Sequence, residues 1–105
     1  MIRHIILFKV KHNCPTIAVN QALQNFLSLQ KKLIGIEAMM VGECHFHENN
    51  SSEFTHAISI DFADKKILEN FFNNPITNFA KDGVVRIAEH GYQGIIGFSI
   101  NGEDE

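Results

Sequence analysis

Hydrophobic and polar side chains alternate along residues 54–62, which read Phe-Thr-His-Ala-Ile-Ser-Ile-Asp-Phe. A period of two is typical of a β-strand with one buried face. The residues of the apolar face are Phe54, His56, Ile58, Ile60 and Phe62. Their bulk predicts a central strand that packs against a helical layer, with His56 as the one polar residue on that face.

Residues 2–10 predict a first strand that is apolar on both faces. The even positions that share one face are Ile2, His4, Ile6, Phe8 and Val10. On the other face, Ile5 and Leu7 stand at the centre between Arg3 and Lys9. A strand with two apolar faces is covered on both sides. Because one small domain has helices for one side only, a partner subunit is the simplest source of the second cover.

Residues 17–33 predict an amphipathic helix, with Thr16 as its cap and Gly35 just past its end. Apolar residues recur along it at spacings of three and four positions. They are Val19, Ala22, Leu23, Phe26, Leu27 and Leu33.

The second half of the chain repeats this alternation of helix and strand. Asp64 predicts the cap of a helix over residues 65–73, and Pro75 suits the first turn of a further helical segment through residue 80. The run Lys-Asp-Gly at 81–83 is a turn signal that closes this segment. Residues 84–89 then form one more helical turn or an irregular link.

Three further stretches complete the predicted sheet and its connections. Residues 36–48 predict a second strand, bent or bulged near Gly42, and residues 48–53 a polar turn that completes a hairpin. Residues 91–100 predict the last strand, and residues 101–105 a frayed tail.

The predicted order is β-α-β-β-α-β, the ferredoxin-like plan. We therefore expect an α+β fold with a four-stranded antiparallel sheet, helices on one face, and a single domain over residues 1–105. A chain this short buries only a modest share of its surface alone. The sequence thus predicts a homodimer.

Charge and composition exclude several kinds of partner. Twelve acidic against nine basic residues give a formal charge of −3, which argues against a nucleic-acid-binding surface. The apolar runs stay far below the roughly 20 residues of a membrane span, and Arg3 and His4 interrupt the first run as no signal peptide would. We expect a cytoplasmic protein with free thiols at Cys14 and Cys44.

His4 and His56 are the candidates for chemistry, since both lie on the helix-facing side of neighbouring strands. If they pair, the imidazoles are adjacent; if the strands overlap end to end, His4 faces Ile60 and the rings are roughly 13 Å apart. Each is either a hydrogen-bonded core group or a wall residue of a small apolar cavity, where histidine can move protons or hold a ligand's polar group.

His45 and His47 could form a metal site with Glu43, because alternate strand residues share a face. We assign Cys44 and Phe46 to the helix-facing side, so the two histidines point away from His4 and His56. With no distant fourth ligand, a surface or subunit-contact pair is the favoured interpretation. No nucleotide-binding or metalloprotease motif is present, and we expect no metal and no cofactor.

Several stretches together resemble the stress-responsive A/B barrel family, or Dabb domains, over residues 1 to about 80. They are the opening ten residues with His4, Leu33–Glu37, Val41–Glu43, Phe54–Phe62 and Asn70–Pro75. The resemblance implies a homodimeric α/β barrel in which two sheets face each other and cover Ile5 and Leu7. It also implies a pocket between each sheet and its helices, near His4 and His56.

A polyketide cyclase of this family resembles the chain at His4 and His56, which favours the register that brings them together. The family's cyclase base, a histidine two residues after the proline, is Thr77 here, and the tyrosine of the same segment is Phe71. Threonine is no base near neutral pH without an activator. The resemblance thus gives His4, His56, Phe71 and Thr77 as ligand-binding candidates, and His4 and His56 as catalytic candidates.

Three functions are compatible with these residues. The first is a dimer that binds a small apolar molecule near His4 and His56. The second is an enzyme of polyketide cyclase or cofactor-free monooxygenase type that uses one of these histidines as a base. The third is a purely structural dimerisation module.

Overall fold

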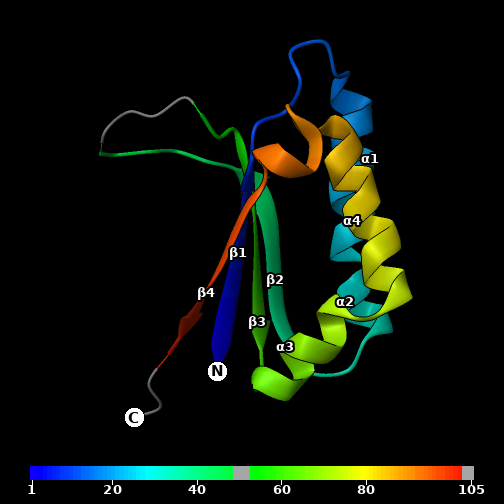
Figure 1. The fold of residues 1–105 in the computed structure, drawn as a ribbon, viewed down its shortest axis with the longest axis vertical. Helices are drawn as coiled ribbons and strands as arrows, with labels where there is room; N and C mark the ends of the chain where they lie inside the picture. Colours follow the sequence, from blue (N-terminus) through cyan, green and yellow to red (C-terminus); the bar gives the residue numbers. More distant parts are fainter. Residues whose placement is uncertain (49–52, 103–105) are drawn as a thin grey trace.

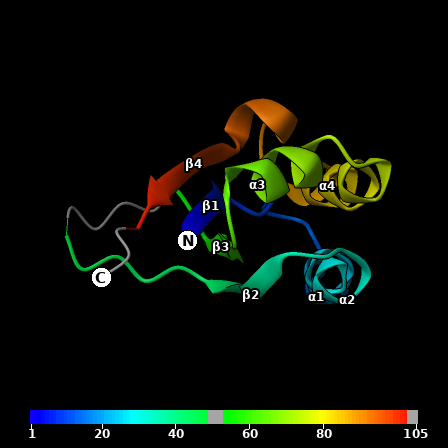
Figure 2. The same cartoon turned by 90° about the horizontal axis from the view of Figure 1, so that it is seen from below.

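The computed structural model describes residues 1–48 and 53–102, which form one four-stranded antiparallel sheet with helices on one face (Figures 1 and 2). The strand order is β2-β3-β1-β4. The strands are β1 (Ile2–Phe8), β2 (Ile36–Glu43), β3 (His56–Phe62) and β4 (Ile96–Asn101). The helices are α1 (Thr16–Leu27), α2 (Leu29–Lys32), α3 (Lys65–Phe72) and α4 (Pro75–Ile87), with one 3₁₀ turn, η1 (Gly91–Gly94). The predicted α+β, ferredoxin-like fold is confirmed.

The core lies between the sheet and α1, α3 and α4. Alternate residues of β1 and β3 point into it, as the period of two predicts. The buried residues of these two strands are Ile6, Phe8, Ile58, Ile60 and Phe62. They pack against the apolar stripes of the helices, which include Leu23, Phe26, Phe71 and Val84. None of the helices in the described part of the chain is long and apolar enough to cross a membrane.

The two central strands pair end to end. His4 lies opposite Ile60, and His56 lies opposite Phe8. The register that the family resemblance favoured, with His4 beside His56, is therefore wrong. Parity fixed the shared face of the two histidines, whereas the overlap of the strands places them four residues apart along the sheet.

The first helical segment begins and breaks at other residues than predicted. Thr16 is the first residue of α1 and not its cap; Pro15 precedes it and has no side-chain acceptor. The predicted single helix over 17–33 is divided at Ser28, whose hydroxyl donates a hydrogen bond to the carbonyl of Asn25 at 2.7 Å. Such local side-chain bonds compete with helical hydrogen bonding.

Helix α4 continues through the predicted turn at residues 81–83. Its buried residues, Thr77, Ala80, Val84 and Ile87, follow the three-and-four spacing of one helix face. Packing of this stripe outweighs the roughly 1 kcal/mol that a glycine such as Gly83 costs within a helix. Both predicted starts are confirmed, since Asp64 caps α3 through Ile67 N–H and Pro75 opens α4.

The predicted second and last strands are both shorter than expected. β2 ends at Glu43, and its irregularity lies between Ile36 and Ala38 instead of near Gly42. β4 starts at Ile96, because His90 and Gly91 adopt left-handed conformations with φ of 65° and 58° and lead into η1.

Parts of two predicted segments lie outside the described residues. These are residues 49–52 of the polar turn and residues 103–105 of the tail. The tail begins later than predicted, since Asn101 pairs with Ile2 in the sheet and Gly102 N–H donates to the carbonyl of Met1 at 3.1 Å.

Alanine substitutions at two glycines test these helix boundaries, because they should change the free energy of unfolding in opposite directions. Gly35 has φ of 89°, and a Cβ there would lie 2.6 Å from Cγ2 of Ile67. We expect Gly35→Ala to lower the free energy of unfolding by about 1–3 kcal/mol. Gly83→Ala, where a Cβ meets nothing within 4 Å, should raise it by about 0.5–1 kcal/mol. Urea denaturation measures both, and equal effects would contradict the assigned geometry.

Candidate functional site

A cavity of about 320 Å³ lies between the sheet and the helical layer. We call it the His4 cavity. Its walls come from β1, β3, β4, three helices and the segment before β4. The lining residues are His4, Ile6, Phe26, Ile58, Leu68, Phe72, Lys81, Val84, Tyr92, Ile95 and Gly97. Most of them are aliphatic or aromatic, with a few polar groups among them, which is the usual character of a small-molecule site.

His4 is half-buried at this cavity and is held from two sides. Its Nδ1 lies 2.7 Å from Oγ of Ser99 on β4, a hydrogen-bond distance. Its ring packs edge-on against Phe72 of α3, with centroids 4.7 Å apart. Gly97 leaves room for the ring, since a Cβ there would lie 3.2 Å from Nε2. The imidazole is therefore positioned by packing as well as by a hydrogen bond.

Burial, and secondarily the charge of Lys81, lower the pKa of His4 below its usual value. Lys81 extends from α4 over two aromatic rings of the cavity. Its Nζ lies 4.8 Å from the centroid of Tyr92 and 6.0 Å from that of Phe72, which are cation–π distances. The cavity thus combines an imidazole that favours its neutral form with a nearby cation.

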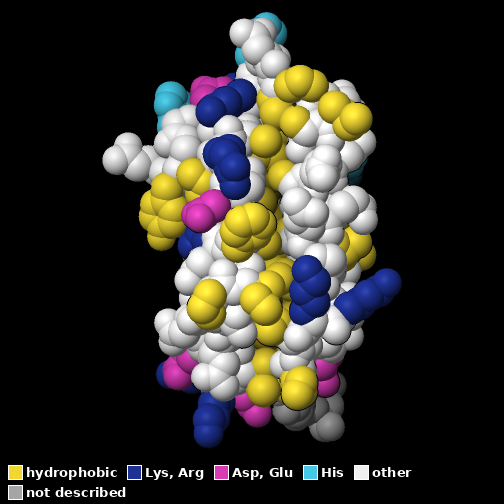
Figure 3. Space-filling model, turned by 90° about the vertical axis from the view of Figure 1, so that its right-hand side faces the viewer, with side chains coloured by type: hydrophobic (Ala, Val, Ile, Leu, Met, Phe, Trp, Pro, Cys, Tyr) yellow, Lys and Arg dark blue, Asp and Glu magenta, His cyan; other side chains and the backbone are white. Residues whose placement is uncertain are grey.

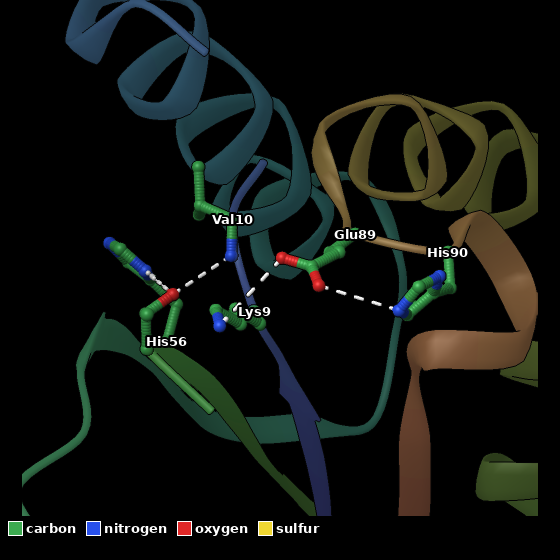
Figure 4. A network of polar contacts seen from close by, with 6 residues as sticks. Lys9, Val10, His56, Glu89 and His90 are labelled. Carbon is green, nitrogen blue, oxygen red and sulfur yellow. Dashed lines mark hydrogen bonds and ion pairs between the residues drawn. The ribbon is translucent and has the colours of Figure 1, made fainter. Parts of the chain in front are cut away.

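His56 lines a different and more polar depression of about 660 Å³, which we call the His56 groove. Its Nδ1 lies 2.8 Å from Oγ1 of Thr55, and that oxygen accepts a hydrogen bond from Val10 N–H at 2.9 Å (Figure 4). Its ring stacks on Phe8 with centroids 5.8 Å apart. Burial lowers the pKa of His56, and the charge of Glu43 partly opposes this shift.

Charged side chains surround the His56 groove. Nζ of Lys9 lies 3.8 Å from Oε2 of Glu89, and Nε2 of His90 lies 3.4 Å from Oε1 of the same carboxylate (Figure 4). Lys9 and Glu89 both line the groove. The two candidate histidines therefore belong to separate sites, one apolar and one polar.

Phe71 and Thr77 lie in the hydrophobic core, and neither is among the lining residues of the His4 cavity. Phe71 packs against the rings of Phe26, Phe62 and Phe72. Thr77 has 0% exposure, and its Oγ1 has no hydrogen-bond partner among the described residues. Both stay ligand-binding predictions. The neighbouring residue in the sequence, Phe72, lines the cavity.

The prediction that Glu43 shares the face away from the helices with His45 and His47 was wrong. Met39 and Val41 pair with the buried Ile60 and Ile58, so the odd positions of β2, including Glu43, face the helices. The strand ends at Glu43 and does not carry the alternation onward to His45 and His47. Within residues 1–48 and 53–102, no three His, Cys, Asp or Glu side chains are grouped so that they could hold a metal ion.

Sequence reasoning missed Lys81, Tyr92 and Gly97 as residues of the cavity. Lys81 was assigned to a turn, and the helical spacing that extends through Val84 and Ile87 was the signal that could have placed it on α4. Gly97 interrupts an apolar strand, which is typical of a site where another group approaches closely. Tyr92 carried no comparable signal.

Solved structures with the same architecture come from several organisms. A dimeric ferredoxin-like protein of unknown function from Jannaschia sp. CCS1 is 18% identical, with a TM-score of 0.85 over 95% of this chain and 97% of that one. A hydroxynitrile lyase from Passiflora edulis is 20% identical, with a TM-score of 0.79 over 99% and 96%. A Dabb family protein with a ferredoxin-like fold from Mesorhizobium loti is 16% identical, with a TM-score of 0.76 over 98% and 97%.

At these identities the neighbours establish the fold alone, and the first is described as dimeric. A comparison with curated proteins found no match. The family comparison is more specific, because the model of the stress responsive A/B barrel domain matches residues 2–90. That range includes β1 to β3, all the helices and most of the cavity residues. The chain belongs to the stress responsive A/B barrel domain family.

Proposed function

We propose that the chain binds a small, mostly apolar molecule in the His4 cavity, as one subunit of a homodimeric A/B barrel. The cavity itself is the observation that carries this function. Its volume of about 320 Å³ stands at the lower end of the roughly 300–1,000 Å³ typical of ligand sites. His4, anchored by Ser99, is a polar group that can fix the orientation of a ligand between apolar walls.

The open face of the sheet supports the homodimer. Ile96, Phe98 and Ile100 of β4 are 48%, 41% and 50% exposed there. The register places Leu7 opposite Ile96 and Ile5 opposite Phe98, so these side chains form one apolar surface. Contiguous exposed apolar surface of this kind marks an interaction site. A second copy of the same sheet face would cover it, as in an A/B barrel.

The geometry favours binding over a defined reaction. The Passiflora edulis neighbour is a hydroxynitrile lyase, which is an enzyme. In this chain, however, the second candidate base, His56, does not line the His4 cavity but the His56 groove. Among the described residues of the His4 cavity, the titratable groups are His4, Lys81 and Tyr92. We therefore propose no reaction and leave the cyclase and monooxygenase alternatives as predictions.

A charge placed on the open sheet face should dissociate the dimer. Phe98→Lys would put an ammonium into the apolar contact, and we expect the dimer dissociation constant to rise by about 100-fold or more. The control is Phe79→Lys, because Phe79 is 73% exposed on α4 and therefore lies on the helical side, away from the open sheet face. Figure 3 shows that hydrophobic side chains on the helical side lie among Lys and Arg. Light scattering coupled to size exclusion measures the mass. A monomeric parent protein, or equal effects of both variants, would overturn the proposed interface.

Filling the cavity should abolish ligand binding while the fold persists. Thermal-shift screening of lipids, aromatics and polyketide-like acids, followed by titration calorimetry, should give ligands for the parent protein. A ligand present at 100 times its dissociation constant stabilises the fold by about 2.7 kcal/mol. Ile95→Trp adds bulk at the cavity wall and should lose that shift, whereas Ile76→Trp, outside the cavity, should keep it. No hit across the screen, or hits that Ile95→Trp leaves unchanged, would refute the function.

The lowered pKa of His4 predicts a pH dependence of stability. Its usual value is about 6.5, so as the pH falls below about 7.5 the unfolded chain takes up this proton more readily than the folded protein. The free energy of unfolding therefore falls with decreasing pH, until the pH drops below the folded-state pKa. We expect His4→Gln to flatten the profile of urea midpoints between pH 8 and 5. A steeper profile in His4→Gln would contradict the assignment.

A further inference from the structure

We propose that the His4 cavity selects amphipathic anions, and that Lys81 is the residue that binds the carboxylate or other oxyanion of the ligand. This inference rests on the proposed function of the cavity and adds the chemical class of its ligand. It assigns the apolar part of the ligand to the cavity interior and the charged part to Lys81, beside Tyr92 and His4.

Lys81 is part of the cavity and does not extend freely into solvent. It is partly buried on α4, one turn before the buried Val84. The rings beneath its ammonium, Tyr92 and Phe72, are themselves lining residues. The aliphatic stem of a lysine packs along apolar surface while its charge stays near water. The two rings thus hold a positive charge at the edge of an otherwise apolar space.

No acidic side chain of the described residues neutralises this charge. Among the described residues, the ion pairs involve Arg3, Lys9 and His90, and none includes Lys81. None of the described residues that line the His4 cavity is an aspartate or a glutamate. A cation over aromatic rings is bound less strongly than one in a charged hydrogen bond. An incoming oxyanion would therefore gain a partner without displacing a carboxylate.

Burial, and then the charge of Lys81, lower the pKa of His4. The field of the ammonium therefore reaches the imidazole. The Nδ1 of His4 is engaged by Ser99, and within the described residues its Nε2 has no hydrogen-bond partner. In its neutral form with a proton on Nε2, His4 would add a hydrogen-bond donor to the same anion. Cation and donor would then come from opposite layers, α4 and β1.

The interior of the cavity fixes the other half of the ligand. Ile6 and Ile58 of the sheet and Phe26 of α1 offer hydrocarbon contacts alone. A volume of about 320 Å³ accommodates a short chain or one substituted ring. The expected ligand is consequently a small acid with one apolar end, in preference to a neutral molecule of the same size.

Octanoate and 1-octanol test the inference, because they share the hydrocarbon chain and differ in charge. Titration calorimetry at pH 7.5 should show that the parent protein binds octanoate about tenfold or more tightly than 1-octanol. Lys81→Met should remove this preference and leave 1-octanol binding unchanged or stronger. Arg86→Met is the matched control, since Arg86 is an exposed cation of the same helix outside the cavity. Methyl NMR shifts of Ile6 and Ile58 locate the bound chain.

The outcomes distinguish failure of the anion assignment from failure of the proposed function. Equal affinities for the two ligands, or a preference that survives Lys81→Met, would overturn the anion assignment and leave the cavity as a binding site. The same holds if Arg86→Met reduces the preference as much as Lys81→Met does. Binding of neither ligand, with no shift at Ile6 and Ile58, would overturn the anion assignment, and the proposed function would fall with it if the wider ligand screen also gave no hit.

Discussion

The antiparallel pairing of β1 with β3 is the constraint on which the rest of the structure depends. It places Ile6 beside Ile58 and His4 beside Ile60, so that one face of both strands forms the floor of the core. Every helix of the described chain packs on that face. The same register separates His4 from His56 by four residues. One pairing therefore creates the core and also divides the two imidazoles between an apolar cavity and a polar groove.

The different surroundings of the two histidines follow from that separation. At one end of the pair, Phe72 and Ser99 hold His4 under the helices. At the other end, Thr55 connects His56 to the backbone of Val10, close to charged side chains. Burial lowers the pKa of both, but Lys81 adds to the shift at His4 whereas Glu43 opposes it at His56. The chain thus uses two similar residues in two electrostatic settings.

The sequence predicted most of the fold because its hydrophobic periods are clear. The period of two assigned the faces of β1 and β3, while the cap residue Asp64 and the proline at position 75 located two helix starts. The sequence did not predict the register of β1 against β3. The alternation of residues determines which side chains share a face, but it does not determine how far the two strands overlap. The turn predicted at residues 81–83 was wrong for a related reason. Local sequence there favours a turn, but the packing of Val84 and Ile87 keeps α4 helical.

The residues of β4 link the cavity to the proposed interface. Towards the helices this strand presents Gly97 and Ser99, which pair opposite Ile6 and His4. Towards the open side it presents Ile96, Phe98 and Ile100. Small side chains on the inner face leave space beside His4, and large ones on the outer face leave apolar surface that needs a cover. A strand that served only the core of its own subunit would have large apolar side chains on the inner face and small or polar ones on the outer face. The alternation of β4 therefore reduces packing within one subunit. This is the physical reason to expect a ligand on the inner side and a second subunit on the outer side.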